Sequence, residues 1–145
     1  MRIYGYIALL LISWSVAAAE VAVIANPQVP ADSLSKDRLY ELYTGESRHW
    51  EGDLAVVVFD LKPKGAVKEA FYKFLGKSPS RMKSVWMKRM LAGEGEPPEA
   101  LASEAEIAAK VAATEGGLGF VSRENVGEGV KVLVLIGTDG EMVVP

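Results

Sequence analysis

Residues 54–75, LAVVVFDLKPKGAVKEAFYKFL, decide the fold that we expect for this chain of 145 residues. Six consecutive apolar residues, 54–59, predict a strand buried on both faces, as in a sheet with helices on each side. Residues 60–65 predict a loop, after which apolar residues recur with helical spacing as far as Leu75. Loops between a strand's carboxyl end and a helix's amino end often bind ligands in open α/β sheets, and free backbone amides there attract anions. The stretch therefore suggests a binding module.

The first nineteen residues have the pattern of a secretory signal peptide. Arg2 supplies the positive charge, residues 3–16 are mostly apolar, and three alanines at 17–19 fit a cleavage site before Glu20. The apolar run is short for a membrane span of about 20 residues. We expect 1–19 to be removed, leaving 20–145 as one periplasmic α/β domain with no stable membrane anchor.

The composition excludes several kinds of chemistry. The chain has no cysteine, which rules out disulfides, thiolate metal sites and cysteine nucleophiles, and suits an exported bacterial protein held by its core. The formal net charge is −3 and no basic run stands out, so nucleic acid is not an expected partner. His49 is the only histidine, and we interpret it as a solvated loop residue. We interpret Trp50 as a cover over the edge of the core.

The remaining elements alternate between strands and helices. The predicted strands are 21–25, one beginning at Phe120, 130–136 and 142–144, and the predicted helices run from Ser35 to Gly45, from Ser78 to about Met90 and from Ser103 to about Ala113. Residues 92–98 alternate glycine and proline with acidic residues and predict a surface connection. The fold class is thus α/β, with a small mixed sheet flanked by helices, parallel crossovers first and a C-terminal β-hairpin.

No catalytic group can be assembled from these elements. The carboxylates occupy helix starts, loops and capping positions, and no serine lies in a G-x-S-x-G elbow. The glycine-rich residues 116–119 precede a strand, whereas phosphate-binding glycine loops follow a strand and open a helix. We therefore expect no enzyme, no cofactor and no metal site.

The loop within the opening stretch carries the candidate ligand site. Lys62 and Lys64 lie just before the helix that begins near Gly65, so an oxyanion at the amides of Gly65, Ala66 and Val67 would meet a helix dipole and one or two cations. The alternative is that both lysines are simply solvated loop charges.

The helix after Ser78 offers a candidate interaction surface. Its apolar residues, which include Trp86 and Met90, keep helical spacing and are expected in the core. Its outward face would carry Lys83, Lys88 and Arg89. The alternative is an ordinary solvated helix face.

Several short patterns together resemble a known family. They are Leu34-Ser35, Leu39-Tyr40, Tyr43-Thr44-Gly45, Trp50-Glu51-Gly52, the strand, loop and helix through Phe71, then Trp86, and Thr114-Glu115-Gly116-Gly117-Leu118-Gly119-Phe120-Val121. In order and spacing, from about Val21 to Val134, the chain looks like the phosphate-type periplasmic solute-binding proteins of ATP-driven transporters. The resemblance is to their second lobe and its short single-lobe relatives.

The resemblance implies one lobe of a type 2 periplasmic-binding-protein fold. In the full-length family, two lobes close on the anion, and this lobe supplies an arginine followed by Ser-Gly-Thr at the loop and helix start. Here the arginine position falls near Leu61, and the other three fall on Gly65, Ala66 and Val67, so every side-chain donor is missing. Backbone amides, Lys62 and Lys64 are what remain.

Two hypotheses follow from the residues and the resemblance. The first is a weak binder of phosphate or a similar oxyanion, associated with an ABC-type membrane transporter or a sensor protein. The second is a periplasmic protein-interaction module that has kept the fold and lost the ligand site.

Overall fold

The computed structural model describes residues 20–137 and 139–143, so the predicted signal peptide, 1–19, lies outside the described residues. The elements are β1 Val21–Ala25, α1 Lys36–Thr44, β2 Val57–Leu61, α2 Ala66–Leu75, α3 Pro79–Leu91, β3 Glu99–Leu101, α4 Glu104–Ala113, β4 Gly117–Ser122, β5 Lys131–Ile136 and β6 Met142–Val143, with short 3-10 helices at Glu51–Asp53 and Arg123–Asn125. Among these residues, no helix is long and apolar enough to cross a membrane.

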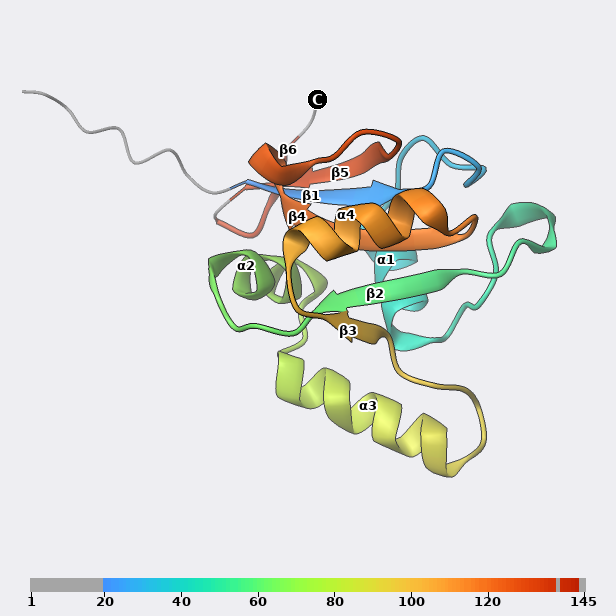
Figure 1. The fold of residues 1–145 in the computed structure, drawn as a ribbon. Helices are drawn as coiled ribbons and strands as arrows, with labels where there is room; N and C mark the ends of the chain where they lie inside the picture. Colours follow the sequence, from blue (N-terminus) through green and yellow to red (C-terminus); the bar gives the residue numbers. More distant parts are fainter. Residues whose placement is uncertain (1–19, 138, 144–145) are drawn as a thin grey trace, which may run out of the picture.

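The strands of the described chain form one mixed sheet in the order β3-β2-β4-β1-β5-β6 (Figure 1). Strand β2 runs parallel to both β3 and β4, whereas β1 is antiparallel to both β4 and β5. β5 and β6 form the predicted C-terminal hairpin. The α/β class with a small mixed sheet is therefore confirmed, but parallel crossovers do not come first, because β4 separates β1 from β2 and runs antiparallel to β1.

Helices cover both faces of the sheet, as alternate residues of β4 show. A Cβ built on Gly119 would lie 2.6 Å from Ile107 Cγ2, so α4 packs closely on this face. Phe120 points the other way and stacks on Phe71 of α2 with ring centroids 3.9 Å apart. In Figure 1, α3 lies outside these layers, on the side of β3. Its link to α1 is Trp86, whose Nε1 donates to the Tyr43 carbonyl at 2.9 Å.

The strand predicted at 54–59 is shifted and is not buried on both faces. β2 begins at Val57, which is 37% exposed, while Phe59 and Leu61 are buried. The physical reason is the register: Val57 and Val58 pair with β4 on one side, but β3 covers the other edge only from Phe59 onwards. The first half of β2 is thus an open edge of the sheet.

Two further boundaries differ from the sequence prediction. β3 was not predicted, and β4 begins at Gly117 rather than at Phe120. Glycines lie just before and at the start of β4 because backbone carbonyl groups approach closely there. A Cβ on Gly116 would lie 1.8 Å from the Ala55 carbonyl oxygen, and one on Gly117 would lie 2.9 Å from the Thr114 carbonyl oxygen.

The helix starts follow the prediction. The hydroxyl oxygens of Ser35, Ser78 and Ser103 accept from the backbone amides three residues later, at the starts of α1, α3 and α4. The tryptophan predictions are also confirmed, because Trp50 and Trp86 are both buried. Met90, which was expected in the core, is instead 50% exposed, because α3 lies outside the main layers.

Candidate functional site

The start of α2 is the part of the candidate site that the backbone builds. The N-cap is Gly65, which has φ 163° and ψ 179°, an extended conformation, and no side chain caps this helix. The first hydrogen bond of the helix runs from Glu69 N–H to the Gly65 carbonyl at 3.0 Å. The amides of Ala66, Val67 and Lys68 precede that bond and have no partner within an α-helix. They are free to meet an acceptor.

A surface pocket of about 340 Å³ lies beside these amides. One wall consists of residues 63–68, and the other of residues 102–104 at the start of α4. Both helices begin at this edge because β2 and β3 are parallel and their carboxyl ends meet there. The structure thus brings Lys64, Gly65, Ala66 and Val67 together in one pocket.

Lys62 does not line that pocket. Its backbone amide donates to the Leu101 carbonyl at 2.8 Å, which continues the pairing between β2 and β3. Leu61, near which the resemblance predicts the arginine position, is buried with 7% of its surface exposed. Of the two predicted lysines, Lys64 is the one placed beside the helix start.

Both positive and negative side chains surround the pocket. The described part of the chain gives the Lys64 side chain no hydrogen bond or ion pair, whereas Lys68 donates to the Leu61 carbonyl at 2.7 Å and lies 3.6 Å from Asp60 Oδ2. Glu104 places a carboxylate on the opposite wall, where Oε1 accepts from the Ser122 amide. An anion would therefore meet one uncommitted ammonium group and one nearby carboxylate.

Sequence reasoning missed Lys68 and the wall formed by Ser103 and Glu104. The capping box at Ser103 did predict a helix start. Its place beside α2 depends on β3, a three-residue strand with little local signal of its own.

The hydroxyl groups near this edge are structural. Burial, and then the charge of Asp60, raise the pKa of Tyr43 and of Tyr72 well above the ordinary value for tyrosine. The Tyr43 hydroxyl donates to the Phe59 carbonyl at 3.0 Å. Both phenols stay protonated at neutral pH and serve as neutral groups.

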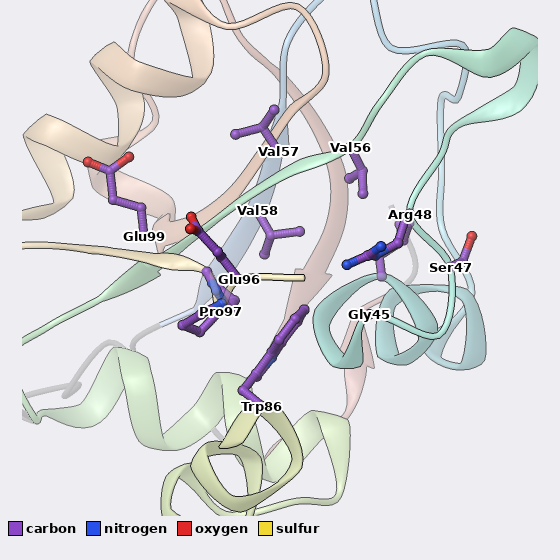
Figure 2. Close-up of a pocket in the computed structure, with 12 residues that line it drawn as sticks. Gly45, Ser47, Arg48, Val56, Val57, Val58, Trp86, Glu96, Pro97 and Glu99 are labelled. Carbon is purple, nitrogen blue, oxygen red and sulfur yellow. The ribbon is translucent and has the colours of Figure 1, made fainter. Parts of the chain in front are cut away.

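A second pocket, of about 300 Å³, lies between the end of α1, the open edge of β2 and α3. Arg48, Trp86, Glu96 and Glu99 are among the residues that line it (Figure 2). The guanidinium group of Arg48 lies against the backbone of Gly95. A Cβ built on that glycine would be 1.6 Å from Arg48 Nη2. With two carboxylates, one guanidinium group and no helix start, this pocket is a poorer oxyanion site than the one at α2.

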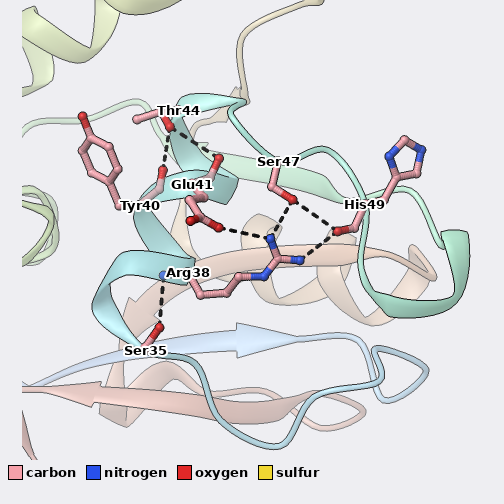
Figure 3. Close-up of polar contacts among 7 residues, drawn as sticks. All are labelled: Ser35, Arg38, Tyr40, Glu41, Thr44, Ser47 and His49. Carbon is pink, nitrogen blue, oxygen red and sulfur yellow. Dashed lines mark hydrogen bonds and ion pairs between the residues drawn. The ribbon is translucent and has the colours of Figure 1, made fainter.

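A polar cluster holds the loop that carries Arg48 (Figure 3). Arg38 Nη1 donates to Ser47 Oγ at 2.6 Å and lies 3.4 Å from Glu41 Oε2, and Nη2 donates to the His49 carbonyl at 2.9 Å. The His49 ring points away from the cluster, and the residue is exposed as predicted. The described residues contain no group of three or more histidine or acidic side chains able to hold a metal ion.

The three cations predicted as an interaction surface are not equivalent. Lys83 and Lys88 are exposed, but they are five residues apart and so point to different sides of a helix with 3.6 residues per turn. Arg89 is partly buried and pairs with Glu94 at 3.2 Å. Arg89 therefore holds the end of α3, while Lys83 and Lys88 remain candidates.

Comparison with solved structures finds this fold in phosphate transport proteins. An ABC-type phosphate transport receptor from Vibrio cholerae matches with a TM-score of 0.65 and 19% identity, covering 81% of this chain and 46% of the receptor. A phosphate ABC transporter substrate-binding protein from Clostridium perfringens, with bound phosphate, gives 0.67 and 18%, covering 81% and 45%. PstS from Borrelia burgdorferi gives 0.58 and 13%, covering 81% and 48%. No family model and no curated protein matches the sequence.

These matches confirm the resemblance predicted from the sequence, at the level of the fold. The chain folds like part of a phosphate-type substrate-binding protein and spans less than half the length of the proteins that it matches. The α/β architecture is thus accounted for. At these identities the likeness concerns the fold alone.

Proposed function

We propose that this chain is a periplasmic solute-binding-like protein that binds phosphate or a similar oxyanion weakly. The observation that carries the proposal is the start of α2, where free amides follow Gly65 and lie beside the uncommitted ammonium group of Lys64. A helix N-terminus attracts anions through both its amides and its dipole. The proposed role is binding rather than catalysis.

The expected affinity is low because the side-chain donors of the family are missing. A hydrogen bond to a charged group contributes roughly 1.5–3 kcal/mol, so three absent donors remove on the order of 4–9 kcal/mol. A solvated lysine returns roughly 0.2–1 kcal/mol. We expect a Kd of about 1 mM or weaker, which corresponds to about 4 kcal/mol.

The setting that we propose is export through residues 1–19 and association with an ABC-type phosphate transporter or sensor. The signal-like sequence supports export. The matched proteins, described as a phosphate transport receptor and as a transporter's substrate-binding protein, support the transport setting. The proposed partner is another protein of that transport or sensing system.

Calorimetry with phosphate and sulfate, at constant ionic strength and with chloride as the reference, tests the oxyanion proposal. Gly65→Asp places a carboxylate where it can cap α2, and Gly65→Ala is the matched control; a Cβ at this position meets nothing within 4 Å. Wild type and Gly65→Ala should bind at millimolar ligand, and Gly65→Asp should not. Equal binding by all three variants, or no binding by wild type at millimolar ligand, would refute the site.

A second function is supported by the two exposed lysines of α3. Lys83 and Lys88 face solvent on a helix that lies outside the main layers of the fold. We propose that they contribute to docking on a periplasmic or membrane protein. Pull-down from periplasm and membranes should recover a partner, and Lys83→Glu with Lys88→Glu should release it. Undiminished recovery by the double variant would count against these residues.

A further inference from the structure

An apolar groove of about 640 Å³ runs along α3. Its apolar lining comes from Met82, Trp86, Met87 and Met90 of the helix and from Pro97 and Pro98 of the segment before β3. Prolines have no backbone N–H, so Pro97 and Pro98 offer the groove no backbone donors. Methionine side chains adapt to differently shaped apolar partners, which makes such a lining suitable for a polypeptide.

The helix lines the groove with one apolar stripe, in which Met82 and Trp86 are buried and Met90 is half-exposed. Pro79, Met82, Trp86 and Met90 follow helical spacing, and a rise of 1.5 Å per residue makes the stripe roughly 16 Å long. Met87 and Met90 are each 50% exposed. Leu91, which follows the stripe, is 83% exposed, so the apolar surface continues beyond the groove. A small molecule within the groove would leave Leu91 uncovered, whereas a peptide segment can cover both.

The charge at the rim of the groove is positive. Asp60 and Lys68 form an ion pair at 3.6 Å and offset each other. Lys64 and Lys83 line the groove too, and neither has an ion-pair partner in the described part of the chain. Two uncommitted cations beside an apolar lining favour an acidic ligand.

We propose that the groove is the docking site for a partner polypeptide segment that is apolar on one side and acidic beside it. The segment lays its apolar side chains against Met87, Met90 and Trp86 and its carboxylates toward Lys64 and Lys83. A helix binding a groove uses anchors at i, i+4 and i+7, which suits a stripe of this length. This inference deepens the second function proposed above. The groove shares Lys64 with the oxyanion site, so Met90 and Lys83, which line only the groove, carry its test.

A random 16-residue peptide library displayed on phage, panned against the purified protein, tests the proposal. Enriched peptides should combine apolar residues at helical spacing with Asp or Glu. In fluorescence anisotropy, Met90→Glu should weaken their binding at least tenfold and Lys83→Glu severalfold. Lys110→Glu, an exposed charge reversal on α4 outside the groove, is the matched control and should change binding less than twofold. Circular dichroism and the urea midpoint check that these exposed substitutions leave the fold intact.

Several results would overturn the proposed docking site. In the panning, these are no enrichment of any peptide or enrichment of basic peptides. In the binding assays, they are unchanged peptide binding by Met90→Glu and displacement of all peptides by dodecanoate at equimolar concentration. Self-association of the protein that Met90→Glu abolishes would also overturn it. If a pulled-down partner is released by Lys88→Glu but retained by Met90→Glu, the docking function stands and the groove is wrong. The phosphate titration of Met90→Glu should match that of wild type, which keeps the two sites separate.

Discussion

The helices α2 and α4 begin on opposite walls of one pocket, but side chains accept hydrogen bonds from backbone amides only at the start of α4. Ser103 Oγ accepts from the Glu106 amide at 3.2 Å, and Glu106 Oε2 accepts in return from the Ala102 amide at 3.1 Å. The first turn of α4 also carries two acidic residues, which favour its positive dipole end. At α2 the N-cap is Gly65 and no side chain fills the same role. One helix start is closed by its own residues and the other is open to a ligand.

Packing of its apolar face, rather than a cap at its start, stabilises α2. Its apolar face carries Phe71, which is fully buried, stacks on Phe120 at 3.9 Å and meets Tyr43 edge-on at 4.7 Å. A serine cap contributes about 1 kcal/mol, whereas burying a large aromatic side chain contributes several times as much. Because packing holds α2 in place, its amides can remain free.

The largest expected effect on stability comes from removing the buried ring of Phe71. Phe71→Ala should lower the free energy of unfolding by roughly 3–5 kcal/mol, since it removes a buried ring and leaves a cavity. Lys73→Ala, on the exposed side of α2, is the control and should stay within about 0.5 kcal/mol. Urea unfolding measures both. If Phe71→Ala cost less than removal of the Ser103 cap, the contrast between the two helices would be wrong.

The next largest effect is tighter phosphate binding after a hydroxyl donor is added at the open start of α2. Val67→Thr adds a hydroxyl within the first turn of α2 and leaves the N-cap as glycine, and a new hydrogen bond to an anion is worth roughly 1.5–3 kcal/mol. Calorimetry with phosphate should show binding about tenfold tighter or more. Val67→Ala lacks the hydroxyl and should bind like wild type. Equal affinities for the two variants would mean that the anion does not bind there.

A smaller effect on stability comes from removing the serine that caps α4. Ser103→Ala should lower the free energy of unfolding by about 1 kcal/mol, because the Glu106 amide loses its acceptor. Ser84→Ala, in the exposed middle of α3, is the control and should have little effect. Phosphate binding should be unchanged in Ser84→Ala, which lies outside the pocket. A Ser103→Ala variant as stable as wild type would show that this cap is not needed.

The smallest expected effect is the loss of phosphate affinity when one of the two loop lysines, Lys64 or Lys62, is neutralised. Lys64→Gln should weaken phosphate binding by roughly 0.2–1 kcal/mol, the range for a solvated charge pair. Lys62→Gln should weaken it less, because Lys62 does not line the pocket. Calorimetry at low ionic strength gives the clearest difference, since salt screens exposed charges. A larger effect at Lys62 than at Lys64 would move the anion away from the start of α2.

The helices could be predicted from the sequence because their signals are local. Ser35, Ser78 and Ser103 mark helix starts by bonds that span three residues, and Gly45 and Gly76 end helices in the left-handed conformation, with φ 76° and 79°. The same local signals placed the free amides after Gly65 correctly. The helical half of the candidate site was thus within reach of the sequence.

The sheet could be predicted only in part, because its pairings join distant residues. The stretch Glu99–Leu101 carries no strand signal of its own and becomes β3 by pairing with β2. The glycines at 116–119 suggested a connection, but they allow α4 and the Ala55 segment to approach β4. The wall of the pocket at Ser103 and Glu104 depends on these pairings and so escaped prediction.

A phosphate titration followed by ¹⁵N–¹H NMR tests the central contrast most directly, because it observes both helix starts in one sample. With a Kd of about 1 mM, the amide signals of Ala66, Val67 and Lys68 should shift and saturate by about 20 mM phosphate. Those of residues 104–106 should stay in place, and Gly65→Asp should abolish the shifts. Equal shifts at both helix starts, or none at either, would contradict the account.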